Sequence, residues 1–125
     1  MSAAPAPRRE DLPDGSVRIF FAAPIVDHGQ AKGHLTLRQP TAGEIWELGD
    51  PRGFIYDKGG LGTPYVDRPL LLQWIRKLIT EHDADVVARE RDPSLGLLIE
   101  EAVLDFFRNA RMRLKPASAP SPVQA

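Results

Sequence analysis

The sequence carries three groups of residues whose side chains could do chemistry. Residues 82–85, His-Asp-Ala-Asp, place three possible metal ligands within four positions. His28 and His34 stand on or beside a short turn, and Lys58 precedes a glycine-rich segment, Gly-Gly-Leu-Gly, at residues 59–62. Imidazole can act as a general base or a metal ligand, and a glycine-rich loop beside a lysine can bind phosphate.

None of the three groups has the spacing that its chemistry requires. Adjacent helical positions point in different directions, so residues 82–85 are better explained as a helix-end cap than as a metal site. His28 and His34 stand next to neither a paired carboxylate nor a plausible serine nucleophile. The glycine-rich segment lacks the spacing of a Walker loop, which indicates a turn or loop. We therefore expect no catalytic residue, no metal and no cofactor, and a protein that is not an enzyme.

The composition narrows the class of protein further. The 125 residues suffice for one small domain, and 42% hydrophobic with 26% charged residues is typical of a folded soluble chain. A net charge of −1 gives no general attraction to nucleic acid or to an anionic membrane. The absence of cysteine suits a reducing compartment. The longest apolar run is far below the roughly 20 residues of a membrane helix, and no secretory signal is visible. We expect a cytoplasmic protein without membrane contacts.

A strand-to-helix corner over residues 34–48 organises the predicted fold. Leu35 and Leu37 alternate with polar residues, which predicts a half-buried strand. Thr41 followed by Glu44 three residues later is the pattern of a capping box. The helix that begins there carries an isoleucine, a tryptophan and a leucine. We expect it to lay this apolar side against the strand.

The residues before this corner predict the rest of a small sheet. Apolar residues alternate over residues 17–21 and predict a strand that ends at Pro24. Gly29 can take the positive φ of a tight turn, so the chain returns antiparallel. The economical fold is an antiparallel sheet of two or three strands.

The second half of the sequence predicts helices. Asp67 with a proline two residues later begins a helix over residues 67–82, and Asp92 with the next proline begins a long helix over residues 93–113. A short helix or turn lies between them. Residues 50–66 hold several glycines without clear periodicity and predict a long loop, too apolar for a linker.

These elements predict an α+β fold with a small antiparallel sheet of two to three strands at the N-terminus packed against three to four helices. Residues 16–114 form the single predicted domain. Residues 1–15, with three prolines, and the low-complexity residues 115–125 are predicted as a disordered arm and a disordered tail.

Residues 35–44, Leu-Thr-Leu-Arg-Gln-Pro-Thr-Ala-Gly-Glu, resemble the LTLREPTAGDL signature of tail assembly chaperones from Mu-like phages, where it also follows a short hairpin. Later segments, ending with Val-Leu-Asp-Phe-Phe at residues 103–107, are similar to the helical remainder of that family. The resemblance covers about residues 17–110. The segment over residues 50–66 departs from it, because the family pattern has a shorter connection.

The resemblance implies a non-catalytic chaperone that binds the tape measure protein in the host cytoplasm during phage tail assembly. The two long helices carry broad apolar stripes and flank the apolar loop, so we expect a groove between them to take an amphipathic helix of the partner. The predicted partner-binding residues are Phe54, Tyr56, Tyr65 and Trp74. Self-association of this surface stays open. Two alternatives also stay open. One is a structural tail subunit. The other is a small nucleic-acid-binding regulator that uses the basic end of the last helix, although residues 41–114 hold 13 acidic against 10 basic residues.

Overall fold

The computed structural model describes residues 5–114, which form two antiparallel sheets and four helices. The main sheet has the order β1-β2-β3-β6, and its strands are β1 (Arg8–Asp11), β2 (Val17–Asp27), β3 (Gln30–Leu37) and β6 (Ile79–Thr80). A separate hairpin consists of β4 (Arg52–Tyr56) and β5 (Gly62–Val66). The helices are α1 (Ala42–Leu48), α2 (Arg68–Leu78), α3 (Ala84–Ala88) and α4 (Pro93–Leu114). The predicted α+β class is confirmed, with one more strand in the sheet than expected.

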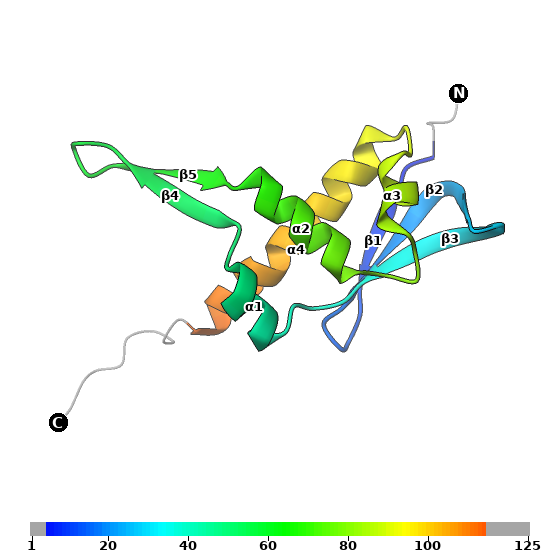
Figure 1. Ribbon diagram of the computed structural model, residues 1–125, viewed down its shortest axis with the longest axis horizontal. Helices are drawn as coiled ribbons and strands as arrows, with labels where there is room; N and C mark the ends of the chain where they lie inside the picture. Colours follow the sequence, from blue (N-terminus) through cyan, green and yellow to red (C-terminus); the bar gives the residue numbers. More distant parts are fainter. Residues whose placement is uncertain (1–4, 115–125) are drawn as a thin grey trace.

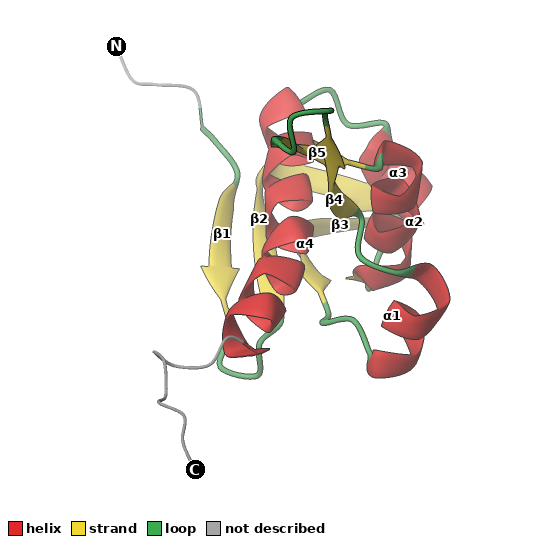
Figure 2. Cartoon of the chain, turned by 90° about the vertical axis from the view of Figure 1, so that its left-hand side faces the viewer, coloured by secondary structure: helices red, strands yellow, loops and turns green. Residues whose placement is uncertain are grey.

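The hydrophobic core lies between one face of β2 and β3 and the helices α2 and α4 (Figure 2). Alternation along the strands places Val17, Ile19 and Leu35 on the inner face, where they are buried. The helix α4 contributes the largest share of the core, through Leu95, Ile99, Ala102, Val103, Leu104, Phe106 and Phe107. Each large apolar side chain buried in this way stabilises the fold by about 1.5–3 kcal/mol.

Trp74 of α2 occupies the centre of this core and is fully buried. Its ring packs edge-on against Phe107 of α4, with 5.1 Å between the ring centroids. Its Nε1–H donates a hydrogen bond of 2.9 Å to the carbonyl oxygen of Gly49, which satisfies the one polar group of the indole. The sequence predicted Trp74 as a partner contact. Its burial makes it a core residue instead.

The strands β2 and β3 are joined by a two-residue turn in which His28 and Gly29 both have positive φ, at 51° and 80°. This conformation matches the twist of the flanking strands. The prediction that the strand ends at Pro24 is wrong. The register shifts between Phe20 and Ile25, and β2 then continues to its end at the turn. Pro24 lies in the irregular stretch, where its missing N–H costs no ladder hydrogen bond.

The strand β1 corrects the prediction of a disordered arm over residues 1–15, of which residues 1–4 lie outside the described residues. It pairs antiparallel with β2. Arg9 donates a 2.6 Å hydrogen bond to Asp105, and the Arg8 guanidinium lies 3.9 Å from the centroid of the Phe20 ring. Ion pairing and a cation–π contact hold this strand rather than apolar burial, so the hydrophobic pattern could not reveal it. The predicted tail over residues 115–125 lies outside the described residues.

The predicted loop over residues 50–66 is a β-hairpin, formed by β4 and β5 and projecting away from the helices (Figure 1). A Cβ atom added to Gly53 would lie 2.6 Å from the Tyr65 ring, and one added to Gly62 would lie 2.9 Å from the Tyr56 ring. Aromatic side chains from the opposite strand thus cover the glycines. The glycines that obscured the alternation are the positions that make room for these rings.

The predicted helix over residues 67–82 ends earlier, with α2 stopping at Leu78. The next two residues form β6, which pairs with the end of β3. The backbone N–H of Arg38 also donates a hydrogen bond to the carbonyl oxygen of Leu78, at 3.0 Å. The edge of the sheet therefore ends the helix, because it offers the chain an alternative set of backbone hydrogen bonds.

The strand-to-helix corner contains the predicted capping box. The Thr41 hydroxyl accepts from the Glu44 N–H at 3.2 Å, and the Glu44 carboxylate accepts from the Thr41 N–H at 2.9 Å. Arg38 adds two hydrogen bonds to Glu44, at 2.8 and 2.6 Å. The Arg38 hydrogen bonds, followed by the one from Thr41, lower the pKa of Glu44 from 4.5 to about 2.

The apolar side of α1 does not pack against the strand as expected. No residue of α1 is buried, and Trp46 is 85% exposed. Only Leu48, in its last turn, packs against the core. The capping box and Arg38 therefore fix this helix more than hydrophobic burial does.

The charge on Glu44 makes the stability of this corner depend on pH. The folded pKa is depressed, so ionised Glu44 stabilises the fold above pH 4.5, and the stabilisation is lost as the pH falls toward 2. We expect Glu44→Gln to lower the free energy of unfolding at pH 7 by about 1–2 kcal/mol, after allowance for solvent screening. The difference from the wild type should vanish near pH 2. Urea unfolding at several pH values measures this.

Glu47→Gln is the matched control, because Glu47 is exposed in the same helix and forms no ion pair among the described residues. It should change stability little at any pH. A destabilisation by Glu44→Gln that stayed constant from pH 7 to pH 2 would contradict the role assigned to the charge.

Candidate functional site

The histidine that the sequence singled out at residue 82 pairs with a buried carboxylate at the end of β2. His82 Nδ1 lies 3.1 Å from Asp27 Oδ2, and neither side chain is accessible to solvent. His82 Nε2 lies 2.8 Å from the carbonyl oxygen of His34. The predicted helix cap is present, but it is made by Asp83, whose side chain accepts from the N–H of Asp85. His82 is instead part of a buried pair that the sequence analysis missed.

One signal in the sequence could have revealed this pair. Asp27 continues the alternation of Val17, Ile19 and Ile25, so it lies on the apolar face of β2. A carboxylate on a buried face requires a partner of opposite charge or a hydrogen-bond donor. The backbone N–H of Asp83 is one such donor, at 2.9 Å from Asp27 Oδ2.

The contacts of His82 define where its protons lie. The carbonyl of His34 can only accept, so His82 carries a proton on Nε2. Nδ1 then faces the carboxylate of Asp27, but the contact is not aligned as a hydrogen bond. Nδ1 of His82 and Oδ1 of Asp27 are therefore buried without a hydrogen-bond partner among the described residues.

This arrangement does not suit general-base catalysis. Both ring nitrogens of His82 are turned toward protein groups and shielded from solvent, so no substrate can reach them. The largely exposed His28 lies 3.2 Å from Asp27 Oδ1, which corrects the expectation that it has no carboxylate beside it. Among the residues that the structure describes, no group of three or more histidine, cysteine, aspartate or glutamate side chains could hold a metal ion.

The hydrogen bond from Asp83, opposed by burial and assisted by nearby positive charges, holds the pKa of Asp27 below its ordinary value. Its ionised form therefore stabilises the fold at neutral pH, and this contribution is lost in acid. The pair joins the turn between β2 and β3 to the start of α3. It is a structural link between two segments that lie 55 residues apart in the sequence.

Three of the four predicted partner contacts lie on the hairpin of β4 and β5. Phe54, Tyr56 and Tyr65 are 59%, 68% and 44% exposed. Cross-strand partners share a face of a sheet, and the register pairs Gly53 with Tyr65 and Phe54 with Pro64. Phe54 and Tyr56 therefore share one face, with 6.2 Å between their ring centroids, and Tyr65 lies on the other face. The hairpin brings two of the predicted residues together and separates the third.

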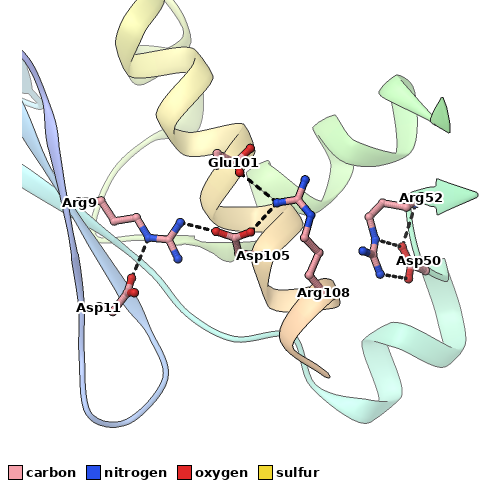
Figure 3. Close-up of polar contacts among 7 residues, drawn as sticks. All are labelled: Arg9, Asp11, Asp50, Arg52, Glu101, Asp105 and Arg108. Atoms are coloured by element: carbon pink, nitrogen blue, oxygen red, sulfur yellow. Dashed lines mark hydrogen bonds and ion pairs between the residues drawn. The ribbon is translucent and has the colours of Figure 1, made fainter. Parts of the chain in front are cut away.

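A hollow of about 780 Å³ lies between the base of this hairpin and α4. Its apolar wall includes Phe54, Val66 and Leu104. Asp50 lies at its edge and accepts hydrogen bonds from Arg52, one of them at 3.1 Å, and from Arg111 at 3.4 Å (Figure 3 shows the pair with Arg52). Burial alone would raise the pKa of Asp50, but these arginines outweigh it and the pKa is lowered.

A second ion network ties α4 to β1 (Figure 3). Asp105 accepts from Arg9 at 2.6 Å and from Arg108 at 2.5 Å, and Arg108 also reaches Glu101 at 3.0 Å. Burial acts to raise the pKa of Asp105, but the two arginines outweigh this effect and lower it. The basic residue Arg108 is therefore engaged within the protein, as is Arg111 through Asp50.

A more apolar groove of about 390 Å³ lies between α2, α3 and α4. The sequence predicted a groove between the two long helices beside residues 50–66. The structure has a groove between these helices, but its third wall is α3. The apolar residues that line it are Leu72, Ile75, Ile79, Val87, Leu95 and Ile99. Charged residues of both signs surround it, including the ion pairs Arg76 with Asp85 and Arg68 with Glu100.

Comparisons with protein-family models, with curated proteins and with solved structures find no match to this chain. The resemblance carried by residues 35–44 therefore stays a prediction. No helix in the described part of the chain is long and apolar enough to cross a membrane.

The buried pair can be tested against its exposed neighbour. His82→Gln removes the buried ring that contacts Asp27 and donates to the His34 carbonyl, so we expect the melting temperature at pH 7 to fall by about 10 °C or more. His28→Gln changes the same residue type at a largely exposed position beside the same carboxylate and should shift it by only about 2 °C. Thermal unfolding followed by circular dichroism measures both. Equal shifts would show that burial of the pair is not what stabilises this end of the sheet.

Proposed function

We propose that this chain is a phage tail assembly chaperone that binds the tape measure protein while the tail is built. The observation that carries the proposal is the apolar groove between α2, α3 and α4. We infer that this groove takes one face of an amphipathic helix of the tape measure protein. The choice of the tape measure protein as the partner rests on the resemblance of residues 35–44 to the chaperone signature. The groove is a surface to which an amphipathic helix can bind.

The groove has the features that helix-in-groove binding requires. Its floor is apolar and its edge carries charges of both signs, so it can match the apolar face and the polar flanks of an amphipathic helix. A volume of about 390 Å³ holds a few apolar anchor side chains rather than a whole helix. Gly96 on α4 has no atom within 4 Å of where a Cβ would stand, which leaves the helix surface open there.

The chemistry of the proposed partner explains why a chaperone is needed. A long helical chain that awaits its tube subunits exposes apolar stripes, and such surfaces aggregate. Binding of anchors at steps of three and four residues would cover these stripes without changing the helix. No bond has to form or break, so the proposal needs no catalytic residue.

The nucleic-acid alternative finds less support in the structure. Arg108 and Arg111 on α4 both bind carboxylates of this chain, which reduces what they offer to phosphates. The basic C-terminal end of the last predicted helix holds two more such residues. Arg113 is exposed, and Lys115 lies outside the described residues. Retardation of DNA or RNA in a gel shift at low salt would favour this alternative. A stoichiometric amount of the protein in purified particles would favour a structural tail subunit.

Co-expression with the tape measure protein of the same genome tests the proposal directly. We expect a higher soluble yield of the tape measure protein and a complex that co-elutes in gel filtration. Leu72→Glu should lower the captured fraction about tenfold or more, because it places a charge in the apolar groove. The absence of both a complex and a gain in solubility with the wild-type chain would overturn the proposal.

Leu97→Glu is the matched control for this experiment. Leu97 is 66% exposed and Leu72 is 52% exposed, but Leu97 lies on α4 outside the groove. Capture by Leu97→Glu should equal that of the wild type. If both variants lose capture equally, the groove is not the binding site.

The hairpin residues predicted from the sequence can be tested in the same assay. Replacing Phe54, Tyr56 and Tyr65 together by Ser should leave the melting temperature almost unchanged, because all three are exposed and lie outside the core. A loss of capture like that of Leu72→Glu would add the hairpin to the binding site. Unchanged capture would confine the site to the groove, and unfolding would show that the hairpin belongs to the core.

A further inference from the structure

The hairpin of β4 and β5 has a strand edge that the fold does not use. Its register is fixed at both ends by backbone hydrogen bonds, from Asp67 N–H to the Pro51 carbonyl at 2.8 Å and from Asp57 N–H to the Leu61 carbonyl at 3.0 Å. Hydrogen-bonded pairs alternate with non-hydrogen-bonded pairs along an antiparallel ladder. The odd-numbered residues of β4 therefore bond to β5, and the even-numbered residues turn their backbone groups outward.

Phe54 and Tyr56 are the residues whose backbone N–H and C=O groups face away from β5 on this edge. Within the described residues, these groups form no hydrogen bond. The third even-numbered residue, Arg52, has its N–H bonded to the side chain of Asp50 at 2.8 Å. The outer half of β4 thus presents donors and acceptors ready to pair with another strand.

The other strand edges in the described structure are less suited to pairing. The part of β2 that β1 leaves open contains Pro24, and the part of β3 that β6 leaves open contains Lys32. The outer edge of β5 contains Pro64, which has no N–H to donate. All four residues of β1 are charged, and β6 has only two residues. In contrast, residues 53–56 of β4 carry no charge. Charges, prolines and short length are the devices that keep sheet edges from pairing. Residues 53–56 have neither a charge nor a proline, and β4 is longer than β1 and β6.

We propose that β4 pairs with the β4 of a second copy of this chain, in an antiparallel arrangement centred on Ile55. The occupant of this edge must be an extended strand, because a helix already uses its own backbone groups and cannot pair. The inference therefore concerns a different surface from the helix-binding groove and does not rest on the proposed function. The open edge of β4 in a second copy supplies the extended strand.

The sequence of β4 suits this symmetric pairing. A twofold axis at Ile55 sets Phe54 opposite Tyr56 of the second copy and repeats the contact on the other side. Each of these two pairs exchanges two backbone hydrogen bonds. The two rings already lie 6.2 Å apart on one face within one chain, so the dimer joins four rings into one cluster. On the opposite face Ile55 meets Ile55 of the second copy.

The area and the charges at this surface fit a dimer. Phe54, Ile55 and Tyr56 are each about three-fifths exposed or more. An aromatic side chain has about 150–250 Å² to bury, of which about three-fifths is still exposed here, so the three residues offer on the order of 300–400 Å² per copy. This value is below that of a standard interface and fits a weak, reversible dimer. Arg52 and Lys58 lie three residues on either side of Ile55 and fall opposite each other in this register. Asp50 neutralises Arg52 at 3.1 Å, so the two positive charges that meet there are not both unpaired.

Cross-linking through a single introduced cysteine tests the register. The chain has no cysteine, so Ile55→Cys can form a disulfide only with its own copy. A non-hydrogen-bonded antiparallel pair brings the two Cα atoms to about 4.5 Å, within the range that a disulfide spans. We expect mild oxidation to give a covalent dimer in most of the protein.

Leu61→Cys is the matched control, because Leu61 is 72% exposed against 62% for Ile55 but lies in the turn, outside the paired segment. It should cross-link at least tenfold less. Equal cross-linking of the two variants would reflect random collision and would overturn the proposal.

Substitution of Ile55 by residues of opposite charge tests the dimer without a covalent cross-link. We expect wild-type protein at about 100 µM to sediment with twice the mass of one 13.8 kDa chain. Ile55→Lys and Ile55→Glu should each be monomeric, because like charges meet at the axis, and an equimolar mixture should recover the dimer. A wild-type protein that stays monomeric, or folded variants whose mixture does not associate, would overturn the proposal. Both variants should still form a complex with the tape measure protein, because the groove is unchanged, whereas Leu72→Glu should lose capture and still dimerise, so the two proposals fail independently.

Discussion

The indole of Trp74 joins three segments that lie far apart in the sequence. Its ring packs against Phe107 of α4, and its N–H binds the carbonyl of Gly49 directly after α1. Gly49 leads through the buried Pro51 into β4, so the position of the indole also sets where the projecting hairpin begins. Truncation of a buried aromatic side chain to alanine typically costs about 3–5 kcal/mol. The orientation of the hairpin therefore depends on the packing of the core.

Polar contacts between side chains hold the elements around this apolar centre. Asp27 and His82 join the turn between β2 and β3 to the start of α3, and Arg38 with Glu44 joins the end of β3 to α1. Asp105 on α4 binds Arg9, the residue that anchors β1. Each pair links a strand to a helical element, where the core alone does not define the position of the chain. These contacts leave the helical groove and the edge of β4 uncovered.

The groove and the strand edge suit partners of different backbone conformation. A helix can bind the groove through its side chains alone, whereas the edge of β4 needs an extended strand that still has free N–H and C=O groups. A dimer formed through β4 would present two grooves to one long helical partner. Two linked binding events raise the effective concentration and strengthen capture without any new contact.

Short-range patterns in the sequence determined the elements whose contacts are local. The capping box at Thr41, the turn at Gly29 and the long helix α4 were predicted because their hydrogen bonds and periodicity span only a few residues. Of the candidate site, the sequence predicted that the hairpin residues are apolar and that a groove lies between two helices. Trp46 and Trp74 show that a helical pattern does not determine which residues are buried. Both follow a helical pattern, yet one is 85% exposed and the other is fully buried.

Only the tertiary structure decided the contacts between distant segments: the pairing of β1 with β2, the buried Asp27 with His82, the two faces of the β4–β5 hairpin and the free edge of β4. Each of them depends on which segments meet in space, and local periodicity does not encode that choice.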